Sequence, residues 1–194
     1  MRFLGLVMHF TGQLSPEKFW ARIGEMDDRV RAAFAEMCFP CLGLAGWPGG
    51  GNLGRWEWQN GELTSVGLVY GSDEGGEPGV HVRTTLSDPH RLAQAGHISG
   101  RPAPRSRQDF ERRLHEPEPT DGFSASIRMD SGELEVTVRP IPQGWLAVAA
   151  LDGYGLVVQG HGVPVEEVAL THVGDIEPFI DGRREEIARR PGES

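Results

Sequence analysis

The sequence predicts an α+β fold, in which an antiparallel sheet of about three β-hairpins packs against one long N-terminal helix and several shorter helices. Three tight-turn signals between apolar strands favour antiparallel pairing, because strands joined by a short turn run in opposite directions. Helical patterns occur singly between these hairpins, which argues against a doubly wound parallel sheet. No shift in composition divides the 194 residues, so we expect a single domain over 1–194, with 96–104 as the alternative boundary.

The first two predicted elements are a buried strand and a long amphipathic helix. Residues 2–10 are mostly apolar and predict the strand, and the break that follows leads to a helix-start signal at 15–17 with a serine cap, a proline and an acid. Apolar side chains then recur every three or four residues from Phe19 to Met37, with charged residues on the other face. Pro40 ends this pattern, so we expect the helix to pack across a sheet.

The middle of the chain predicts a long connection and the first hairpin. Residues 42–54 are rich in glycine and predict an irregular loop. An alternating strand at 55–59, a turn at Asn60-Gly61 and a second strand at 63–70 then form the strongest hairpin signal. A further strand is expected at 80–86, followed by a short helix that begins near Ser87 and ends near Gly96.

The second half predicts two more hairpins and further short helices. Prolines and arginines at 101–105 indicate a loop, and a helix is expected from 108 to 115. Hairpins follow at 123–139 and 145–160, with turns around Asp130-Ser131-Gly132 and Asp152-Gly153. The chain then predicts a short strand at 170–173 and a helix from 175 to 187.

Charge and hydropathy exclude several classes of function. The 19 basic and 28 acidic side chains give a net charge of -9, which is the wrong sign for a broad nucleic-acid interface. No apolar segment is long enough to span a bilayer, so no membrane association is expected. With two cysteines and no export signal, the sequence predicts a cytoplasmic protein without disulfides.

Two short motifs resemble functional signatures but occur in the wrong context. Residues 49–54 match the glycine spacing of a dinucleotide-binding loop, yet a loop precedes them and a strand follows, so no helix N-terminus is available for a pyrophosphate. Cys38 and Cys41 form a C-x-x-C pair at the end of a helix, where the dipole disfavours a thiolate. No second pair completes a zinc site. We therefore expect no metal and no cofactor.

The strongest acid–base candidate is His161. It lies between Gly160 and Gly162 at the end of a predicted central strand, where small neighbours let a side chain line a cavity. His172 and Asp175 follow on the next segment and are candidates to orient it. The competing interpretation is a turn histidine with one side in solvent.

The leading functional prediction is a non-catalytic module that binds a small molecule or a protein. Trp56 and Trp58 share one face of a strand beside the glycine-rich loop, an arrangement that suits an aromatic platform, although core packing explains them equally well. An arginine-rich stretch at 101–113 is suited to an anion or an acidic partner. The predicted ligand-binding residues are Trp56, Trp58, Gly50, Gly51, Arg105 and Arg112.

Two alternatives remain open at this point. The first is a small acid–base enzyme that uses His161 with His172 or Asp175. The second is a structural homodimer formed through an exposed sheet edge or the long helix. The sequence favours a non-catalytic role without deciding whether the chain is an enzyme, and it identifies neither the ligand nor the partner.

Overall fold

The computed structural model describes residues 15–71, 77–90, 108, 122–142 and 144–189, and a nine-stranded sheet dominates it. The strand order is β1-β9-β5-β6-β7-β8-β4-β3-β2. The strands are β1 (Leu42–Leu44), β2 (Asn52–Gln59), β3 (Glu62–Gly71), β4 (Gly79–Thr85), β5 (Phe123–Met129), β6 (Gly132–Ile141), β7 (Gly144–Leu151), β8 (Tyr154–His161) and β9 (Ala169–His172). The helices are α2 (Pro16–Ala35), α5 (Glu177–Arg189) and the 3-10 turn η3 (Val165–Glu167).

The predicted fold class is wrong, because the sheet is mixed and curled and most of the structure is strand. The three expected hairpins do form, as β2–β3, β5–β6 and β7–β8. However, β4 pairs with β8 and β9 pairs in parallel with β5, so the hairpins merge into one half-barrel instead of a simple antiparallel α+β sheet. The several shorter helices are also wrong, since the described ranges contain only two α-helices.

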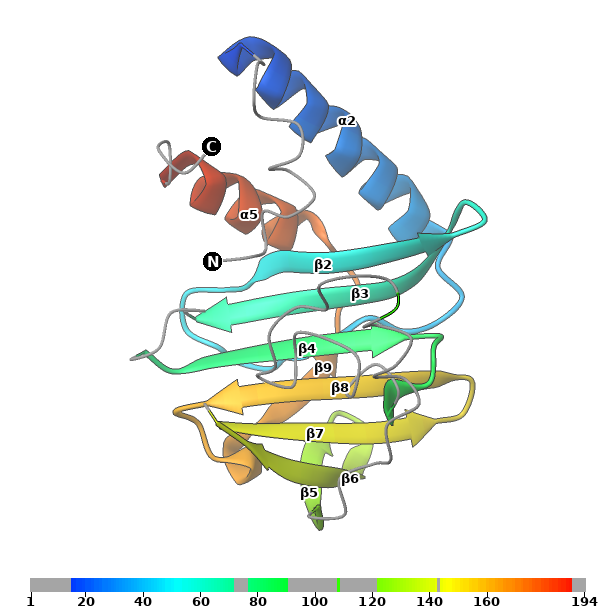
Figure 1. Cartoon of the computed structure of the whole chain (residues 1–194), viewed down its shortest axis with the longest axis vertical. Helices are drawn as coiled ribbons and strands as arrows, with labels where there is room; N and C mark the ends of the chain where they lie inside the picture. The colour runs from blue at the N-terminus through cyan, green and yellow to red at the C-terminus, as the bar shows by residue number, and fades with distance from the viewer. Residues whose placement is uncertain (1–14, 72–76, 91–107, 109–121, 143, 190–194) are drawn as a thin grey trace.

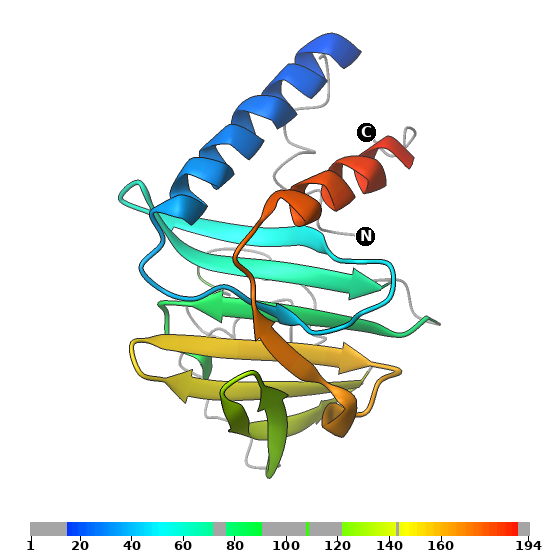
Figure 2. The ribbon, with the colours of Figure 1, turned by 180° about the vertical axis from the view of Figure 1, so that it is seen from behind.

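The sheet curls so that β9 and β1 lie across its inner face, as Figure 2 shows from behind. The edge of β1 opposite β9 is hydrogen-bonded to two side chains of the inner face. Thr84 Oγ1 accepts from the Leu42 amide at 3.1 Å, and Tyr70 Oη accepts from the Leu44 amide at 2.9 Å. These bonds satisfy edge amides that would otherwise be buried without partners.

The main core fills the inside of this curl. Cross-strand register aligns a row of apolar side chains through five neighbouring strands, all nearly inaccessible to solvent: Val138, Ala147, Val158, Val82 and Leu68. Because side chains alternate along a strand, the residues between these positions point to the opposite, outer face. This second face carries the polar residues of the central strands.

The two helices lie beyond β2 at one end of the sheet (Figure 1). Ser15 caps α2 by accepting from the Lys18 amide, and Pro16 occupies the first turn. Asp27 of α2 is fully buried and is bonded to Arg183 and Arg184 of α5, which joins the helices through a charged contact. No helix within the described ranges is long and apolar enough to cross a membrane.

The glycine-rich connection is more ordered than predicted. Residues 42–44 form β1, and β2 begins at Asn52, so only the stretch between them is irregular. A Cβ at Gly51 would meet the rings of Tyr70 and Phe179, which explains the need for glycine there. The predicted strand at 2–10 and the predicted helix at 108–115, apart from residue 108, lie outside the described residues.

Candidate functional site

The outer face of the central strands brings polar side chains from distant parts of the sequence together. Register places them in two cross-strand rows on β6, β7, β8 and β4. The first row is Arg139, Leu146, Gln159 and His81, and the second is Thr137, Val148, Val157 and Arg83. His161 lies on the same face, one row further along β8, opposite Gly79. We call His81, Arg83, Arg139, Gln159 and His161 the outer-face cluster.

An apolar floor separates the two arginines of the cluster. It consists of Leu146, Val148 and Val157, whose exposed fractions are 2%, 1% and 1%, and Ile141 packs against it. These side chains form a hydrophobic cluster distinct from the core inside the curl. These apolar side chains are almost inaccessible to solvent, so they form a second, smaller core on this side of the sheet.

Arg83 is the most constrained member of the cluster, with only 4% of the residue exposed. Its Nε donates to Ser65 Oγ at 2.7 Å. Its Nη2 lies 2.8 Å from Glu57 Oε1 in an ion pair. Burial lowers the pKa of Arg83, and the Glu57 carboxylate opposes that shift. The guanidinium is therefore held in place by Ser65 and Glu57.

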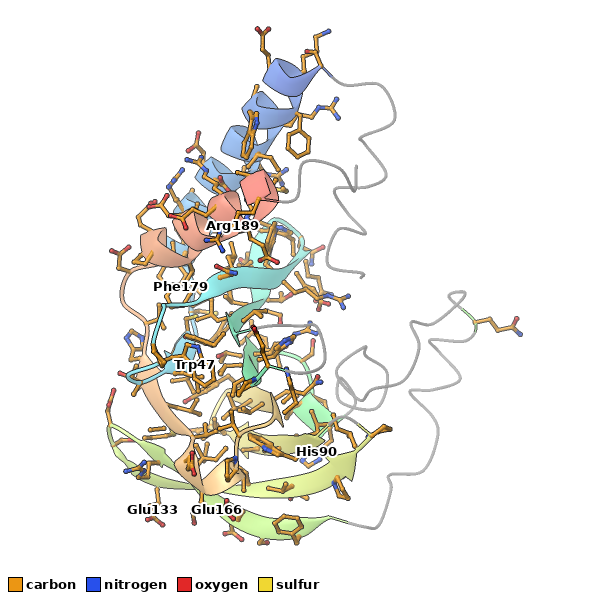
Figure 3. The ribbon with its side chains drawn as sticks, turned by 90° about the vertical axis from the view of Figure 1, so that its left-hand side faces the viewer. Trp47, His90, Glu133, Glu166, Phe179 and Arg189 are labelled. Carbon is orange, nitrogen blue, oxygen red and sulfur yellow. The ribbon has the colours of Figure 1, made fainter. Side chains whose placement is uncertain are left out.

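The histidines of this face are close to one another. Gly79 pairs with His161, so His81 is the diagonal neighbour of His161, at a typical separation of about 7–8 Å. The Nε2 atom of His161 is buried and accepts or donates no hydrogen bond within the described part of the chain. Figure 3 shows His90 on the side of the sheet away from Trp47 and Phe179, and Pro89 packs against Gly155 of the outer face.

The arginines and acids of the central strands balance, because β6 carries Glu133 and Glu135 as well as Arg139, and β4 carries Arg83. Strands β4, β7 and β8 contain no acidic residue, although the chain carries 28 acids against 19 bases. In the same region Arg83 and Arg139 are 4% and 8% exposed. Buried guanidinium groups require compensating negative charge, and Glu57 of β2 supplies it to Arg83.

His172 and Asp175, the predicted partners of His161, lie elsewhere in the structure. His172 pairs with Leu42 of β1, which contacts Thr84 on the inner face. Gly79 is the residue of β4 that pairs with His161. Thr84 lies five positions after Gly79, which is a separation of roughly 16 Å along the strand. Asp175 caps the start of α5 by accepting from the Glu177 amide at 2.9 Å. The structure does not bring these three residues together.

The tryptophans and glycines of the predicted binding surface pack within the fold. Arg183 lies over the Trp56 ring at 4.9 Å and Arg29 over the Trp58 ring at 5.5 Å, so arginines of the helices cover both rings. Gly51 packs under Tyr70 and Phe179, whereas Gly50 is open and has a φ of 75°. Their role in ligand binding stays a prediction. Arg105 and Arg112 lie outside the described residues.

The C-x-x-C pair has the environment of structural cysteines. Cys38 is exposed, Cys41 is fully buried, and both thiols are free. Burial raises the pKa of Cys41 to about 12, which keeps its thiol protonated at neutral pH. Among the described residues, no three His, Cys, Asp or Glu side chains are placed to hold a metal ion.

Comparison with known proteins adds no functional information to this geometry. No family model, no curated protein and no solved structure matches the chain. The side chains of the outer face are therefore the evidence on which a function can be based. In chemical terms they provide fixed cations, imidazole rings and an amide beside an apolar floor.

Sequence analysis found one member of the cluster, His161, and missed the other four. The signal for two of them is present in the strand predicted at 80–86, where His81 and Arg83 alternate with valines. Such alternation indicates a polar face as well as an apolar one. Arg139 and Gln159 join that face only through the pairing of β4 with β8, which no local pattern reveals.

Proposed function

We propose that the chain is a non-catalytic module that binds a small molecule on the outer face of its central strands. The observation that carries this proposal is the outer-face cluster itself: five polar side chains from three strands lie on one face of the sheet. Small-molecule sites use a small number of placed polar groups to orient the ligand. A cytoplasmic location stays a prediction that accompanies this proposal.

The proposal is tested by thermal shift and native mass spectrometry of the full chain against a metabolite panel. His81 and Gln159 are half-buried, so the H81A/Q159A double variant should fold while losing polar contacts to the ligand. The matched control is H172A, which removes an exposed imidazole from β9. We expect compounds that stabilise the wild type and H172A but not the double variant. The proposal fails if no compound stabilises the wild type, or if the same compounds stabilise the double variant equally.

A second candidate function is supported by one specific observation. The buried Nε2 of His161 forms no hydrogen bond within the described residues, so it is free to contact a bound substrate. This favours acid–base catalysis on the same face, with His81 as the nearest imidazole in place of His172 or Asp175. If a panel compound is converted to product, H161A should abolish turnover without a large change in melting temperature.

A further inference from the structure

We infer that Asn60 is a site of spontaneous covalent modification, in which its side-chain amide is lost as ammonia and the turn between β2 and β3 gains a negative charge. This modification is independent of the binding proposed for the outer face. It is indicated by the geometry of the Asn60-Gly61 turn. The chain also supplies its own comparison, because Asn52 is its only other asparagine.

The reaction begins at the backbone nitrogen of Gly61, and asparagine is one of the thermolabile residues of proteins. After losing its proton to hydroxide, this nitrogen attacks the Cγ atom of Asn60 and forms a five-membered succinimide ring. The bond between Cγ and Nδ2 breaks, and Nδ2 takes up a proton and leaves as ammonia. Water then opens the ring. Cleavage between the nitrogen and Cγ gives aspartate, and cleavage between the nitrogen and the main-chain carbonyl carbon gives isoaspartate.

The attacking nitrogen is accessible in the turn. Gly61 lies between Gln59 and Glu62, which pair with each other, and its N–H donates no hydrogen bond within the described part of the chain. Both Asn60 and Gly61 are exposed. Because glycine has no Cβ, no side chain obstructs the approach of this nitrogen to the neighbouring Cγ atom.

The amide under attack is also free, in contrast to that of Asn52. Among the described residues, nothing forms a hydrogen bond with the side chain of Asn60. The Nδ2 atom of Asn52 donates to Glu186 Oε2 at 2.9 Å, and Leu53, which follows Asn52, is 2% exposed in the core. Asn52 also belongs to β2, where Leu53 pairs with Leu68. The fold therefore restrains one asparagine at every group that must move and leaves the other unrestrained.

The products are poorly suited to the turn. Asn60 has a φ of 55° and Gly61 a φ of 90°, as a two-residue hairpin turn requires. Isoaspartate lengthens the backbone by one carbon atom, so the pairs next to the turn, Gln59 with Glu62 and Trp58 with Leu63, would lose their register. We therefore expect the modified protein to unfold at a lower temperature than the unmodified protein.

The experiment ages the full-length protein at mildly alkaline pH, which promotes loss of the Gly61 proton, in native buffer and in urea. Trypsin cuts after Arg31, Arg55 and Arg83, so the two asparagines fall on separate peptides, 32–55 and 56–83. Mass spectrometry then measures the fraction of each peptide in which the asparagine has become an acid. Folding should slow the reaction at Asn52 by about a hundredfold or more and at Asn60 by about tenfold or less, because a turn opens locally whereas a paired strand does not.

The matched control is N60G. Gly-Gly also forms this two-residue turn, so the variant should fold, and it has no side-chain amide at position 60. After ageing in native buffer, the wild type should gain a more acidic species on ion exchange, and that species should have a lower melting temperature. Aged N60G should gain neither.

Three results would overturn the inference. The first is an Asn60 that reacts in urea and stays intact in native buffer, because the turn would then protect it. The second is a reaction that folding slows equally at Asn60 and Asn52. The third is an aged N60G that gains the same acidic species as the wild type, since the charge would then arise at another residue.

Discussion

Asp27 illustrates how one residue holds two helices together. Its carboxylate is fully buried and is shared by Arg183, which is 7% exposed, and Arg184, whose Nε lies 2.6 Å from Oδ2. Burial lowers the pKa of Arg183, and Asp27 opposes that shift. Removing the carboxylate would leave a buried guanidinium without its anion, which is more damaging than the absence of the whole pair.

We therefore expect D27A to lower the free energy of unfolding by about 3–5 kcal/mol. The neighbouring residue supplies the control: Asp28 is 77% exposed at its side chain and pairs with Arg31 on the surface, so D28A should cost less than about 1 kcal/mol. Urea unfolding followed by fluorescence measures both. Equal losses in the two variants would show that the buried pair does not join the helices as described.

At the scale of elements, the turns were predictable and the partners of the strands were not. Asn60-Gly61 and Asp152-Gly153 identified their hairpins correctly, because residues that adopt positive φ specify tight turns locally. The pairing of β4 with β8 joins residues about 75 positions apart in sequence, for which composition and periodicity hold no local signal. The same long-range pairing builds the outer-face cluster, which explains why only His161 was identified.

The edge strand β1 depends on Tyr70, whose hydroxyl accepts from the Leu44 amide. Y70F leaves that buried amide without its partner and should lower the free energy of unfolding by about 1–3 kcal/mol. Burial raises the pKa of Tyr70 to about 12 from an ordinary value of 10.0. The unfolded chain therefore loses this proton first, and stability falls as pH rises from about 10 to 12.

The stability of the Y70F variant should fall less at alkaline pH than that of the wild type, because the contribution of Tyr70 is absent. Denaturant unfolding at several pH values between neutrality and pH 11 measures the difference. Y154F is the matched control, because Tyr154 is only partly buried. If Y154F and Y70F reduce the alkaline loss of stability to the same degree, the burial of Tyr70 is not the cause of that loss.

Two helical glycines have opposite environments and so predict opposite effects. A Cβ at Gly24 of α2 meets no atom within 4 Å, whereas one at Gly182 of α5 collides with Asn52 and comes within 2.7 Å of the Gly51 carbonyl. We expect G24A to stabilise the protein by about 0.5–1 kcal/mol, because alanine favours the helix. G182A should destabilise it by about 1–3 kcal/mol, because α5 must move away from β2. Thermal unfolding measures both variants. A higher melting temperature for G24A and a lower one for G182A would support this packing, because helix propensity alone would raise both.

For the whole molecule, the main feature is a single curled sheet whose two faces carry different kinds of side chain. The inner face is crossed by β9 and β1 (Figure 2) and holds the main core. The outer face carries the outer-face cluster and the smaller apolar cluster. The alternation of apolar and polar residues in individual strands was readable from the sequence. The curl and the parallel pairing of β5 with β9 were not, because they depend on contacts across the whole chain.

The most direct test of this division is NMR of the imidazole rings during titration with a compound of the metabolite panel that stabilises the wild type. His81 and His161 lie on the outer face, whereas His172 lies on β9 across the inner side. Ligand binding to the outer face should shift the ring signals of His81 and His161 in a saturable manner and leave those of His172 unchanged. Saturable shifts at His172 with none at His81 and His161 would contradict the assignment of the binding site to the outer face.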